Sequence, residues 1–403
     1  MKVSRILVSV AIASIAVAHP LDVVKRYINT TELEDDIPDS SKGDAQTAYG
    51  KPFAIYQPKA FIVSMFEYER EPWLDALDFA HNISIPGLSP LYPDIYCTTN
   101  YTVCQVTTGE GDINAAATLS ALTLNPLFDL TKTYWLIAGI AGGEPNYTTL
   151  GSVAFAKYAI QVGLEYQIDY TEYHKTNPNW TTGYFAYGTD NPWTYPGNVY
   201  GTEVFELNES LRNRAFELAQ KATLNNGTQT NAKFRAKYTE KKAKSFPSVE
   251  KCDSLTSDNY FTGKVLNDYF SKFSSMMTNG SSKYCTTAQE DNASLEVFTR
   301  SQKHGLVDFD RIVLMRSVSD FSRPPPSLAN DTVKFFTKTN EGGSIAAVEN
   351  LVNAGFPFIR DVVQKWDKIY SSGKRFPSKN YVGDIYGTLG GIPDFGKESF
   401  EEA

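Results

Sequence analysis

Residues 312–320 combine an apolar run with three side chains that are suited to acid chemistry. Residues 312–315 predict a buried strand, and Arg316, Ser319 and Asp320 follow at its C-terminal end. In open α/β sheets, ligands bind outside the carboxyl ends of the strands. A carboxyl group held there is partly shielded from water and faces a cleft, which suits a general acid. The alternative is that Asp320 only caps the turn after the strand.

The elements that must position these residues alternate between strand and helix patterns. Strands are predicted at 60–64, 103–107 and 134–138, and the last of them breaks at the glycines of residues 139–143. Helices are predicted at residues 71–80, 113–124, 209–223, 292–304, 344–353 and 359–370, and residues 180–205 form a long loop region. This alternation indicates an α/β sheet with crossover helices. Because the strand signals are spread from residue 61 to 315, we expect a single domain over 59–403 with large loop insertions.

The first residues have the pattern of a secretory signal. Lys2 and Arg5 supply the positive charge, residues 6–17 are apolar, and small residues at 16–18 form a cleavage site, so 1–18 is predicted to be a signal peptide. Residues 19–58 are polar and acidic and predict a propeptide or an extended N-terminal arm. Beyond the signal, no run approaches the roughly 20 apolar residues that a spanning helix needs. We therefore expect no integral membrane span.

Sequons, cysteines and charge agree with an exported protein. The sequence has Asn-X-Ser/Thr at ten positions, namely Asn29, Asn82, Asn100, Asn146, Asn179, Asn208, Asn226, Asn279, Asn292 and Asn330. Four cysteines allow three pairings, of which we favour Cys97 with Cys104 and Cys252 with Cys285. A formal net charge of -8 argues against a nucleic-acid partner. No Cys/His cluster indicates a metal, and no cofactor is expected. We predict a secreted or cell-surface, cell-wall-associated glycoprotein.

Six segments, taken together, resemble the nucleoside phosphorylase/nucleosidase superfamily. They are the strand at 61–65 with acidic residues behind it, the glycine-bearing turn at 107–116, the loop at 139–143, and residues 257–261, 290–293 and 316–320. Over roughly residues 59–370 the chain also resembles a narrower family, the fungal and bacterial purine nucleoside permease proteins. This resemblance rests on the order and spacing of residues 64–67, 138–143, 150–155, 166–169 with Glu172, 290–293 and 316–326. The resemblance implies a mixed central sheet flanked by helices, with purine nucleosides (adenosine, inosine, guanosine) as ligands. A homo-oligomer is left open.

The resemblance also implies roles for individual residues. Asp320 would contact purine N7, which makes the leaving base more acidic, and Tyr260 or Phe261 would stack on the base or, alternatively, pack in the core. Glu67 or Glu69 would position or deprotonate an attacking water, unless each is only a solvated residue of a first helical turn. The remaining substrate-binding candidates are Gly109, Ile140, Ala141, Gly142, Asp291, Asn292, Arg316 and Ser319.

Departures from the superfamily pattern bear on the reaction. By spacing, Ile137 and Ile140 stand where related phosphorylases hold phosphate with Arg and Ser, so water is the expected nucleophile. Asn292 stands in place of a ribose-binding Glu; if its amide contacts ribose, its sequon is buried and unglycosylated. Glu69 fits the nucleosidase's catalytic Glu only with a one-residue insertion. We therefore expect an exported protein that hydrolyses the purine N-glycosidic bond in nucleoside salvage; the alternative is a binding and uptake factor without catalysis.

Overall fold

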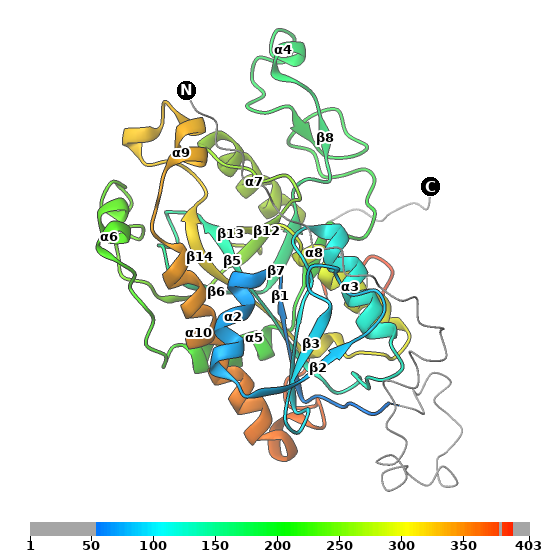
Figure 1. Cartoon of the computed structure of the whole chain (residues 1–403). Helices are drawn as coiled ribbons and strands as arrows, with labels where there is room; N and C mark the ends of the chain where they lie inside the picture. The colour runs from blue at the N-terminus through cyan, green and yellow to red at the C-terminus, as the bar shows by residue number, and fades with distance from the viewer. Residues whose placement is uncertain (1–53, 379–380, 390–403) are drawn as a thin grey trace, which may run out of the picture. The chain divides into compact units, whose positions relative to one another are not determined.

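The computed structural model describes residues 54–378 and 381–389 (Figure 1). The predicted signal peptide and residues 19–53 of the predicted arm lie outside the described residues. The last residues of that predicted arm join the folded body. The backbone N–H groups of Ile55 and Tyr56 donate to the carbonyl oxygen of Leu127 at 3.0 and 2.9 Å, and Tyr56 forms an isolated parallel bridge with Phe128. The folded part thus begins before the first strand.

A twelve-stranded mixed sheet is the centre of the fold, which confirms the predicted α/β class. Its main path runs β10-β7-β12-β13-β5-β1-β4-β3-β2, with β14 pairing β5 and β6, and β6 pairing β11. The strands are β1 (Ala60–Ser64), β2 (Phe79–Ser84), β3 (Asp94–Thr98), β4 (Val103–Thr107), β5 (Tyr134–Gly143), β6 (Val153–Ala156), β7 (Tyr158–Gln161), β10 (Val204–Glu206), β11 (Val249–Lys251), β12 (Asp253–Thr256), β13 (Tyr284–Ala288) and β14 (Ile312–Phe321).

Helices cover both faces of this sheet because its central strands are apolar on both sides. Successive side chains of a strand point to opposite faces. In β1, Phe61 and Val63 join a core with α3 and α8, whereas Ala60 and Ile62 join a core with α2, α5 and α10. Figure 1 shows these two helical layers. The helices are α2 (Glu67–Ala76), α3 (Asp112–Leu124), α4 (Tyr170–Tyr173), α5 (Glu209–Ala219), α6 (Gln229–Arg235), α7 (Lys264–Met277), α8 (Asp291–Lys303), α9 (Thr332–Lys338) and α10 (Ser344–Gln364).

Three helix predictions differ from the structure. Helix α2 begins at Glu67 instead of residue 71, and residue 79 already belongs to β2. The predicted helices at 344–353 and 359–370 are one continuous helix to Gln364, followed by a short π-helix, Trp366–Tyr370. Pro357 lies inside α10 and removes one backbone hydrogen bond. The helix continues through it because Leu351 and Phe358, on either side of the proline, are fully buried in the same core.

The predicted break of the third strand at Gly139 is wrong. Strand β5 continues to Gly143 and pairs with β14 in parallel over most of its length. Gly139 is needed for space and not for a turn. A Cβ atom there would collide with Nη1 of Arg316 and would lie 2.5 Å from Cε of Met65 and 2.9 Å from Oε1 of Glu69. The missing side chain lets these three residues meet above the strand.

The predicted loop at 180–205 is largely irregular. It contains only β9 (Tyr184–Phe185), which pairs with β8 (Tyr166–Gln167) as a separate two-stranded sheet, and the start of β10. In Figure 1, β8 and α4 lie beyond the end of the main sheet. Among the described residues, no helix is both long and apolar enough to cross a membrane.

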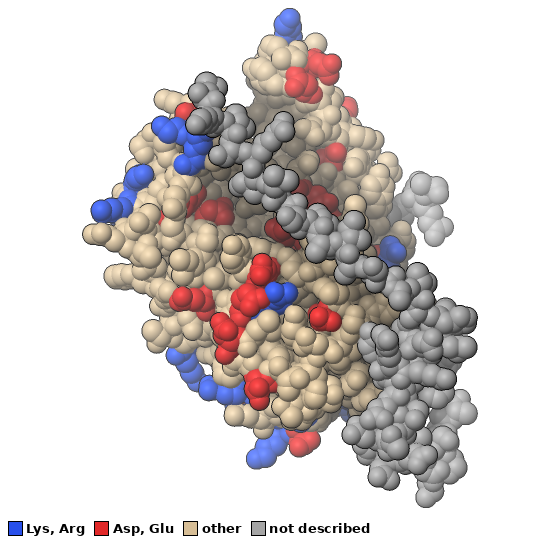
Figure 2. Space-filling view, viewed as in Figure 1, with Lys and Arg blue, Asp and Glu red and all other residues tan. Residues whose placement is uncertain are grey.

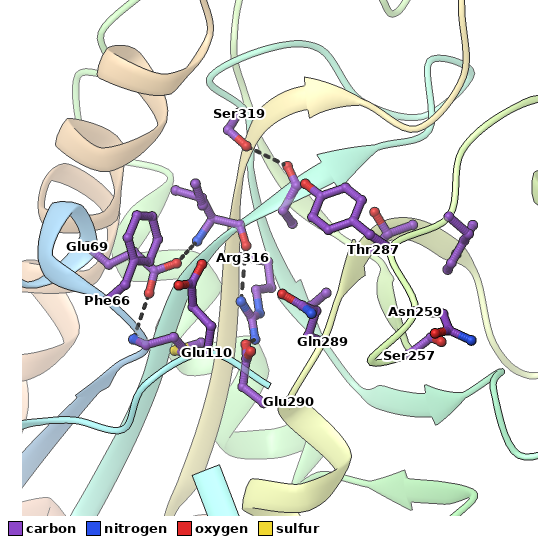
Figure 3. Close-up of a pocket in the computed structure, with 16 residues that line it drawn as sticks. Phe66, Glu69, Glu110, Ser257, Asn259, Thr287, Gln289, Glu290, Arg316 and Ser319 are labelled. Atoms are coloured by element: carbon purple, nitrogen blue, oxygen red, sulfur yellow. Dashed lines mark hydrogen bonds and ion pairs between the residues drawn. The ribbon is translucent and has the colours of Figure 1, made fainter. Parts of the chain in front are cut away.

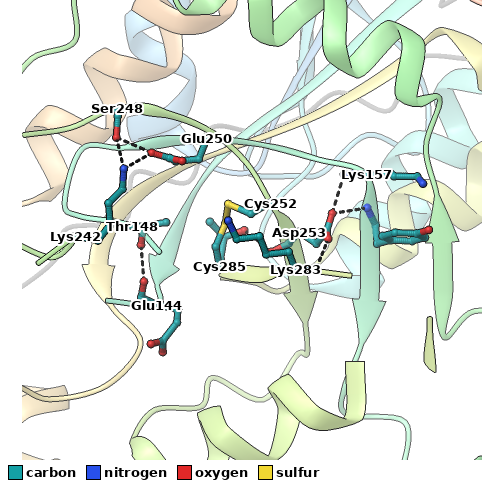
Figure 4. Close-up of a disulfide and its surroundings, with 12 residues drawn as sticks. Glu144, Thr148, Lys157, Lys242, Ser248, Glu250, Cys252, Asp253, Lys283 and Cys285 are labelled. Atoms are coloured by element: carbon teal, nitrogen blue, oxygen red, sulfur yellow. Dashed lines mark hydrogen bonds and ion pairs between the residues drawn. A yellow bond between two sulfur atoms is a disulfide. The ribbon is translucent and has the colours of Figure 1, made fainter. Parts of the chain in front are cut away.

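Both predicted cysteine pairs form disulfides. Cys97 and Cys104 face each other on the neighbouring strands β3 and β4. Cys252 precedes β12 and bonds to Cys285 of β13 (Figure 4). Beside that bridge, the Asp253 carboxylate accepts backbone N–H groups of Lys157 at 2.9 Å and of Lys283 at 2.6 Å. The disulfide and Asp253 therefore hold β7, β12 and β13 together near their beginnings, and the opposite ends of β12 and β13 lead into a pocket.

Candidate nucleoside site

A pocket lies where the strands β1, β4, β12 and β13 end. In Figure 3, Arg316 lies in the middle of the view, with Glu69 on one side and Ser257 and Asn259 on the other. The lining residues are Met65, Phe66, Glu69, Glu110, Ile140, Ala141, Ser257, Asn259, Tyr260, Phe261, Thr287, Ala288, Gln289, Glu290, Arg316 and Ser319.

Arg316 is the buried cation of this pocket, with only 2% of its surface exposed. Its Nη2 donates to Oε1 of Glu290 at 2.7 Å, its Nε donates to Oδ1 of Asp291 at 3.0 Å, and its Nη1 donates to the carbonyl oxygen of Ile140 at 3.0 Å. Burial opposes the charged form, but the two carboxylates outweigh it and raise the pKa of Arg316 above its usual value. The guanidinium is thus fixed and electrically compensated by the protein.

Glu69 points into the pocket from the first turn of α2. Its Oε2 accepts the backbone N–H of Met65, and its Oε1 accepts the backbone N–H of Ile140, both at 2.7 Å. Burial raises the pKa of Glu69 to about 8; the charge of Arg316 opposes this shift, and Glu290 adds to it. A carboxyl group with a pKa in this range is suited to exchange a proton with water near neutral pH.

Asp320 lies beyond Ser319, at a bulge near the end of β14. Val318 pairs with Ala141 and Asp320 pairs with Gly142, so Ser319 is an extra residue on this strand. The Ser319 hydroxyl donates to Oδ2 of Asp320 at 2.7 Å. Burial raises the pKa of Asp320 above its usual value, and the hydrogen bond from Ser319 works against that shift. The carboxyl group therefore holds a proton more readily than an exposed aspartate.

Asp320 faces a second cavity, which adjoins the first. Four residues line both cavities, namely Tyr260, Phe261, Thr287 and Ser319. Glu341 lies in the second cavity together with Asp320. The two cavities share this wall, so a ligand that occupied both would lie beside Glu69 and Arg316 in the first cavity and beside Asp320 in the second.

The structure brings most of the predicted site residues together. Glu69, Ile140, Ala141, Tyr260, Phe261, Arg316 and Ser319 line the first cavity, and Asp320 lines the second. A Cβ atom on Gly142 would lie 3.2 Å from Oδ1 of Asp320, so this glycine is directly beside the acid. Gly109 does not line either cavity, but its neighbour Glu110 lines the first one.

Besides these two glycines, three predicted residues lie away from the cavity walls. Glu67 is solvated: its side chain is 65% exposed, and its carboxylate lies 4.0 Å from Arg70. Of the two predicted glutamates, only Glu69 lines the cavity. Asp291 is fully buried behind Arg316 and also accepts the hydroxyl of Ser254 at 2.8 Å. Asn292 is 2% exposed, and its amide binds other parts of the protein.

The amide of Asn292 is fully engaged. Its Nδ2 donates to the carbonyl oxygens of Thr202 at 2.8 Å and Glu203 at 3.1 Å, and its Oδ1 accepts the hydroxyl of Thr256 at 2.7 Å. These bonds join the start of α8 to the segment before β10 and to β12. A contact between Asn292 and a ribose hydroxyl stays a prediction, since no ligand group is needed to satisfy this amide.

Two sequons are expected to carry no glycan in the folded protein. Asn208 and Asn292 are 1% and 2% exposed, and the amide nitrogen of Asn208 donates to the carbonyl oxygens of Asp310 at 3.1 Å and Phe376 at 2.9 Å. A glycan bonded to either nitrogen would replace one of its two hydrogens and so remove one of its two donor bonds, and the buried side chain leaves no space for the sugar. Glycopeptide mass spectrometry of secreted protein should show both asparagines unmodified, with the exposed Asn100 and Asn179 as the positive comparison. High occupancy at Asn292 would contradict this burial.

Glu110, Glu290 and Glu341 were missed as individual site residues. Glu290 belonged to a recognised motif, but its side chain could not be assigned to the pocket without its bond to Arg316. Glu110 follows Gly109, which has a positive φ, and the sequence does not show in which direction the backbone turns there. Glu341 comes from the loop between α9 and α10, which has no periodic pattern. Figure 2 shows acidic side chains gathered on the face of the molecule that is seen in Figure 1, some of them in a recess.

Fold and site together define an α/β protein with a pocket at the strand ends that is lined by carboxyl groups and aromatic rings. The family model described as purine nucleoside permease (NUP) matches residues 57–375. The chain is 68% identical over 393 residues to a purine nucleoside permease of Candida albicans, which covers 97% of this chain and 96% of that protein. A probable purine nucleoside permease of Schizosaccharomyces pombe is 39% identical over 322 residues, covering 78% of this chain and 91% of that protein. The chain belongs to the purine nucleoside permease family.

Solved structures of nucleosidases show a more distant likeness. A 5'-methylthioadenosine/S-adenosylhomocysteine nucleosidase from Neisseria meningitidis has a TM-score of 0.42 at 13% identity, covering 73% of this chain and 97% of that one. The corresponding enzyme from Campylobacter jejuni has a TM-score of 0.46 at 14% identity, covering 76% of this chain and 99% of that one. At this identity the likeness concerns the arrangement of the chain and not its chemistry.

Proposed function

We propose that this protein binds purine nucleosides in the two joined cavities and serves nucleoside uptake from outside the cell. The observation that carries the proposal is the shared wall of Tyr260, Phe261, Thr287 and Ser319. It offers aromatic faces for a flat base, with polar and charged groups at both ends. Two relatives that bear the name purine nucleoside permease support the ligand class. The two disulfides agree with the secretory pathway, where such bonds persist.

A second candidate function is hydrolysis of the N-glycosidic bond. The specific observation in its favour is that each of the two joined cavities is lined by a carboxyl group, the buried Glu69 in the first and the partly buried Asp320 in the second. Water would attack C1′ of the sugar while Glu69 takes its proton. The C1′–N9 bond would break with its electron pair going to the purine, which gains a proton at N7 from Asp320. The products would be ribose and free base, and uptake of the base would follow.

Water is favoured over phosphate because the groups that could hold an anion are already bonded within the protein. At the start of α3, the N–H of Gly111 donates to Glu290 at 3.1 Å and the N–H of Asp112 donates to Asp258 at 2.8 Å. The N–H of Ile140 donates to Glu69. Free helix N-termini bind phosphate, but here the protein's own carboxylates take that place. They would also repel an incoming anion.

Chromatography of adenosine, inosine and guanosine incubated with the purified secreted protein tests both functions. Nucleoside binding by titration calorimetry, without turnover, would support capture alone. Free base that appears at the same rate with and without phosphate would add hydrolysis. A strict need for phosphate would contradict the arrangement of α3 and Ile140. If no purine nucleoside binds and none is cleaved, the proposal fails.

A further inference from the structure

A ring of helix α9 meets Tyr260 at the wall of the second cavity. The ring centroids of Tyr260 and Phe336 are 5.3 Å apart, and the two rings are tilted by 49°. Both side chains line the second cavity, and Tyr260 lines the first one as well. Because Tyr260 is 59% exposed and Phe336 is 46% exposed, packing of the core does not account for this contact.

The backbone beside Tyr260 is fixed to the end of β14. The hydroxyl of Thr262 and the N–H of Gly263 both donate to the carbonyl oxygen of Ser322, at 2.9 and 3.0 Å. Gly263 also lies beside the start of α9, since a Cβ atom there would be 3.5 Å from Cγ2 of Thr332. The segment that carries Tyr260 therefore has a set position, whereas the exposed ring of Tyr260 takes no part in these contacts.

Helix α9 is anchored separately, by the residue next to Phe336. Phe335 is 2% exposed and packs in a core cluster, where its ring is nearly parallel to that of Phe234, with centroids 6.5 Å apart. The carboxylate of Asp331 caps the helix by accepting the N–H of Lys334 at 3.0 Å. Consecutive residues of an α-helix point about 100° apart. With Phe335 in the core, Phe336 therefore lies at the cavity wall.

The contact with Phe336 limits the freedom of the Tyr260 ring. An exposed tyrosine ring changes rotamer, and a ligand that stacks on it must first hold it in one orientation. A second ring at a tilt, with centroids within about 4.5 to 7 Å, attracts the first ring and restricts it. Because Phe336 and Tyr260 are carried by separately anchored segments, the orientation of the Tyr260 ring is set before a ligand arrives.

We propose that Phe336 is a positioning residue, which holds the ring of Tyr260 in place and so raises the affinity for ligands that carry an aromatic base. The inference rests on the proposed function, because it assumes that Tyr260 stacks on the base. It needs no particular edge of the base to face any group, since every base presents an aromatic face. Of the two predicted stacking residues, Phe261 is already packed against Phe270, with ring centroids 4.7 Å apart.

Titration calorimetry with adenosine measures the role of Phe336. Phe336→Ala is expected to weaken Kd by about five- to tenfold, because the ring of Tyr260 loses its partner. Phe336→Tyr keeps the ring and should keep the wild-type Kd. Val333→Ala, at a 73% exposed residue of the same helix that lines neither cavity, is the matched control and should also keep it.

The double variant separates positioning from a general structural role. Tyr260→Ala alone should weaken Kd by about 10- to 100-fold, the usual effect of removing one base–aromatic stack. If Phe336 acts through Tyr260, adding Phe336→Ala to Tyr260→Ala should weaken Kd no further. A structural role would instead make the two losses multiply. Losses that multiply, or a wild-type Kd in Phe336→Ala, would overturn the inference while the proposed function stands.

The Tm of each variant shows whether it folds. Should Phe336→Ala fold poorly, Phe336→Leu fills more of the space without offering a ring and should still weaken Kd by at least about twofold. An unchanged Kd in Tyr260→Ala would also overturn the inference, since Phe336 would then have no stacking ring to position. Absence of binding and cleavage for every purine nucleoside would instead remove the proposed function itself.

Discussion

Replacing Asp320 by asparagine is expected to slow the release of purine base by about 10²- to 10⁴-fold, the usual contribution of a general acid. The side chain keeps its size and can still accept the hydroxyl of Ser319, but it cannot give a proton to N7. Nucleoside binding should change by no more than about tenfold, which corresponds to about 1.4 kcal/mol, because only one hydrogen bond to the ligand is altered. Single-turnover chromatography and titration calorimetry measure the two effects separately.

The exposed Asp75 on α2 provides the control, since Asp75→Asn makes the same chemical change outside both cavities. An unchanged rate in Asp320→Asn would show that another group protonates the base. If the wild-type protein binds nucleosides without releasing base, Asp320 serves recognition alone, and Asp320→Asn should then weaken binding without any change in a rate.

Replacing Glu69 by glutamine is expected to lower the release rate by at least about 10²-fold. The reason is that a base must be ionised to take a proton from water. Because the pKa of Glu69 is raised to about 8, most of this carboxyl group is protonated at pH 7, and kcat/KM should rise with pH through about 8. Glu69→Gln should remove the rising part, as a pH profile of both proteins would show.

Glu69 also has a structural task, because it accepts the backbone N–H groups of Met65 and Ile140. Glutamine can accept only one of them without turning its own N–H toward a donor, so some loss of Tm is expected. Binding of adenosine and the Tm are therefore measured alongside the rate. Glu71→Gln on the same helix, at a side chain that is 47% exposed, is the control. A profile with no rising part in the wild type would exclude Glu69 as the base.

The strand–helix alternation and the cysteine pairs were predictable, because periodicity and spacing are local signals. The ends of β1 and β4 were predictable for the same reason, whereas Glu69 and Ile140 were assigned to the site only by the resemblance to a known family. Helix α10 was predicted as two helices with a break at residues 354–358. Local helix propensity does not show that the residues on both sides of Pro357 are buried in one core, and this burial keeps the helix continuous. Gly139 was taken for a breaker because the sequence does not show that Arg316 occupies the space above it.

The side-chain directions within the site could not be predicted. Asn292 lies one residue after Asp291 at the start of α8, and only the neighbours of that turn decide which amide or carboxyl group turns inward. Glu341 is 21 residues after Asp320, in a loop that the sequence does not connect to β14. Its place depends on a hydrogen bond from the backbone N–H of Phe321 to its own carboxylate. Neither the composition nor the periodicity of the sequence indicates such a bond.

The extra residue in β14 means that the number of residues in this strand, and not only their types, determines which side chains reach the second cavity. In a regular strand, consecutive side chains point to opposite faces, yet Ser319 and Asp320 both face the second cavity. They do so because Val318 and Asp320 are opposite consecutive residues of β5. A substitution at position 319 changes one hydroxyl group. Deletion of the residue would instead restore the regular alternation of the strand, so two consecutive side chains could no longer both face the second cavity. Among members of this family, we therefore expect insertions and deletions in the loops, and none between the residues that correspond to Val318 and Asp320.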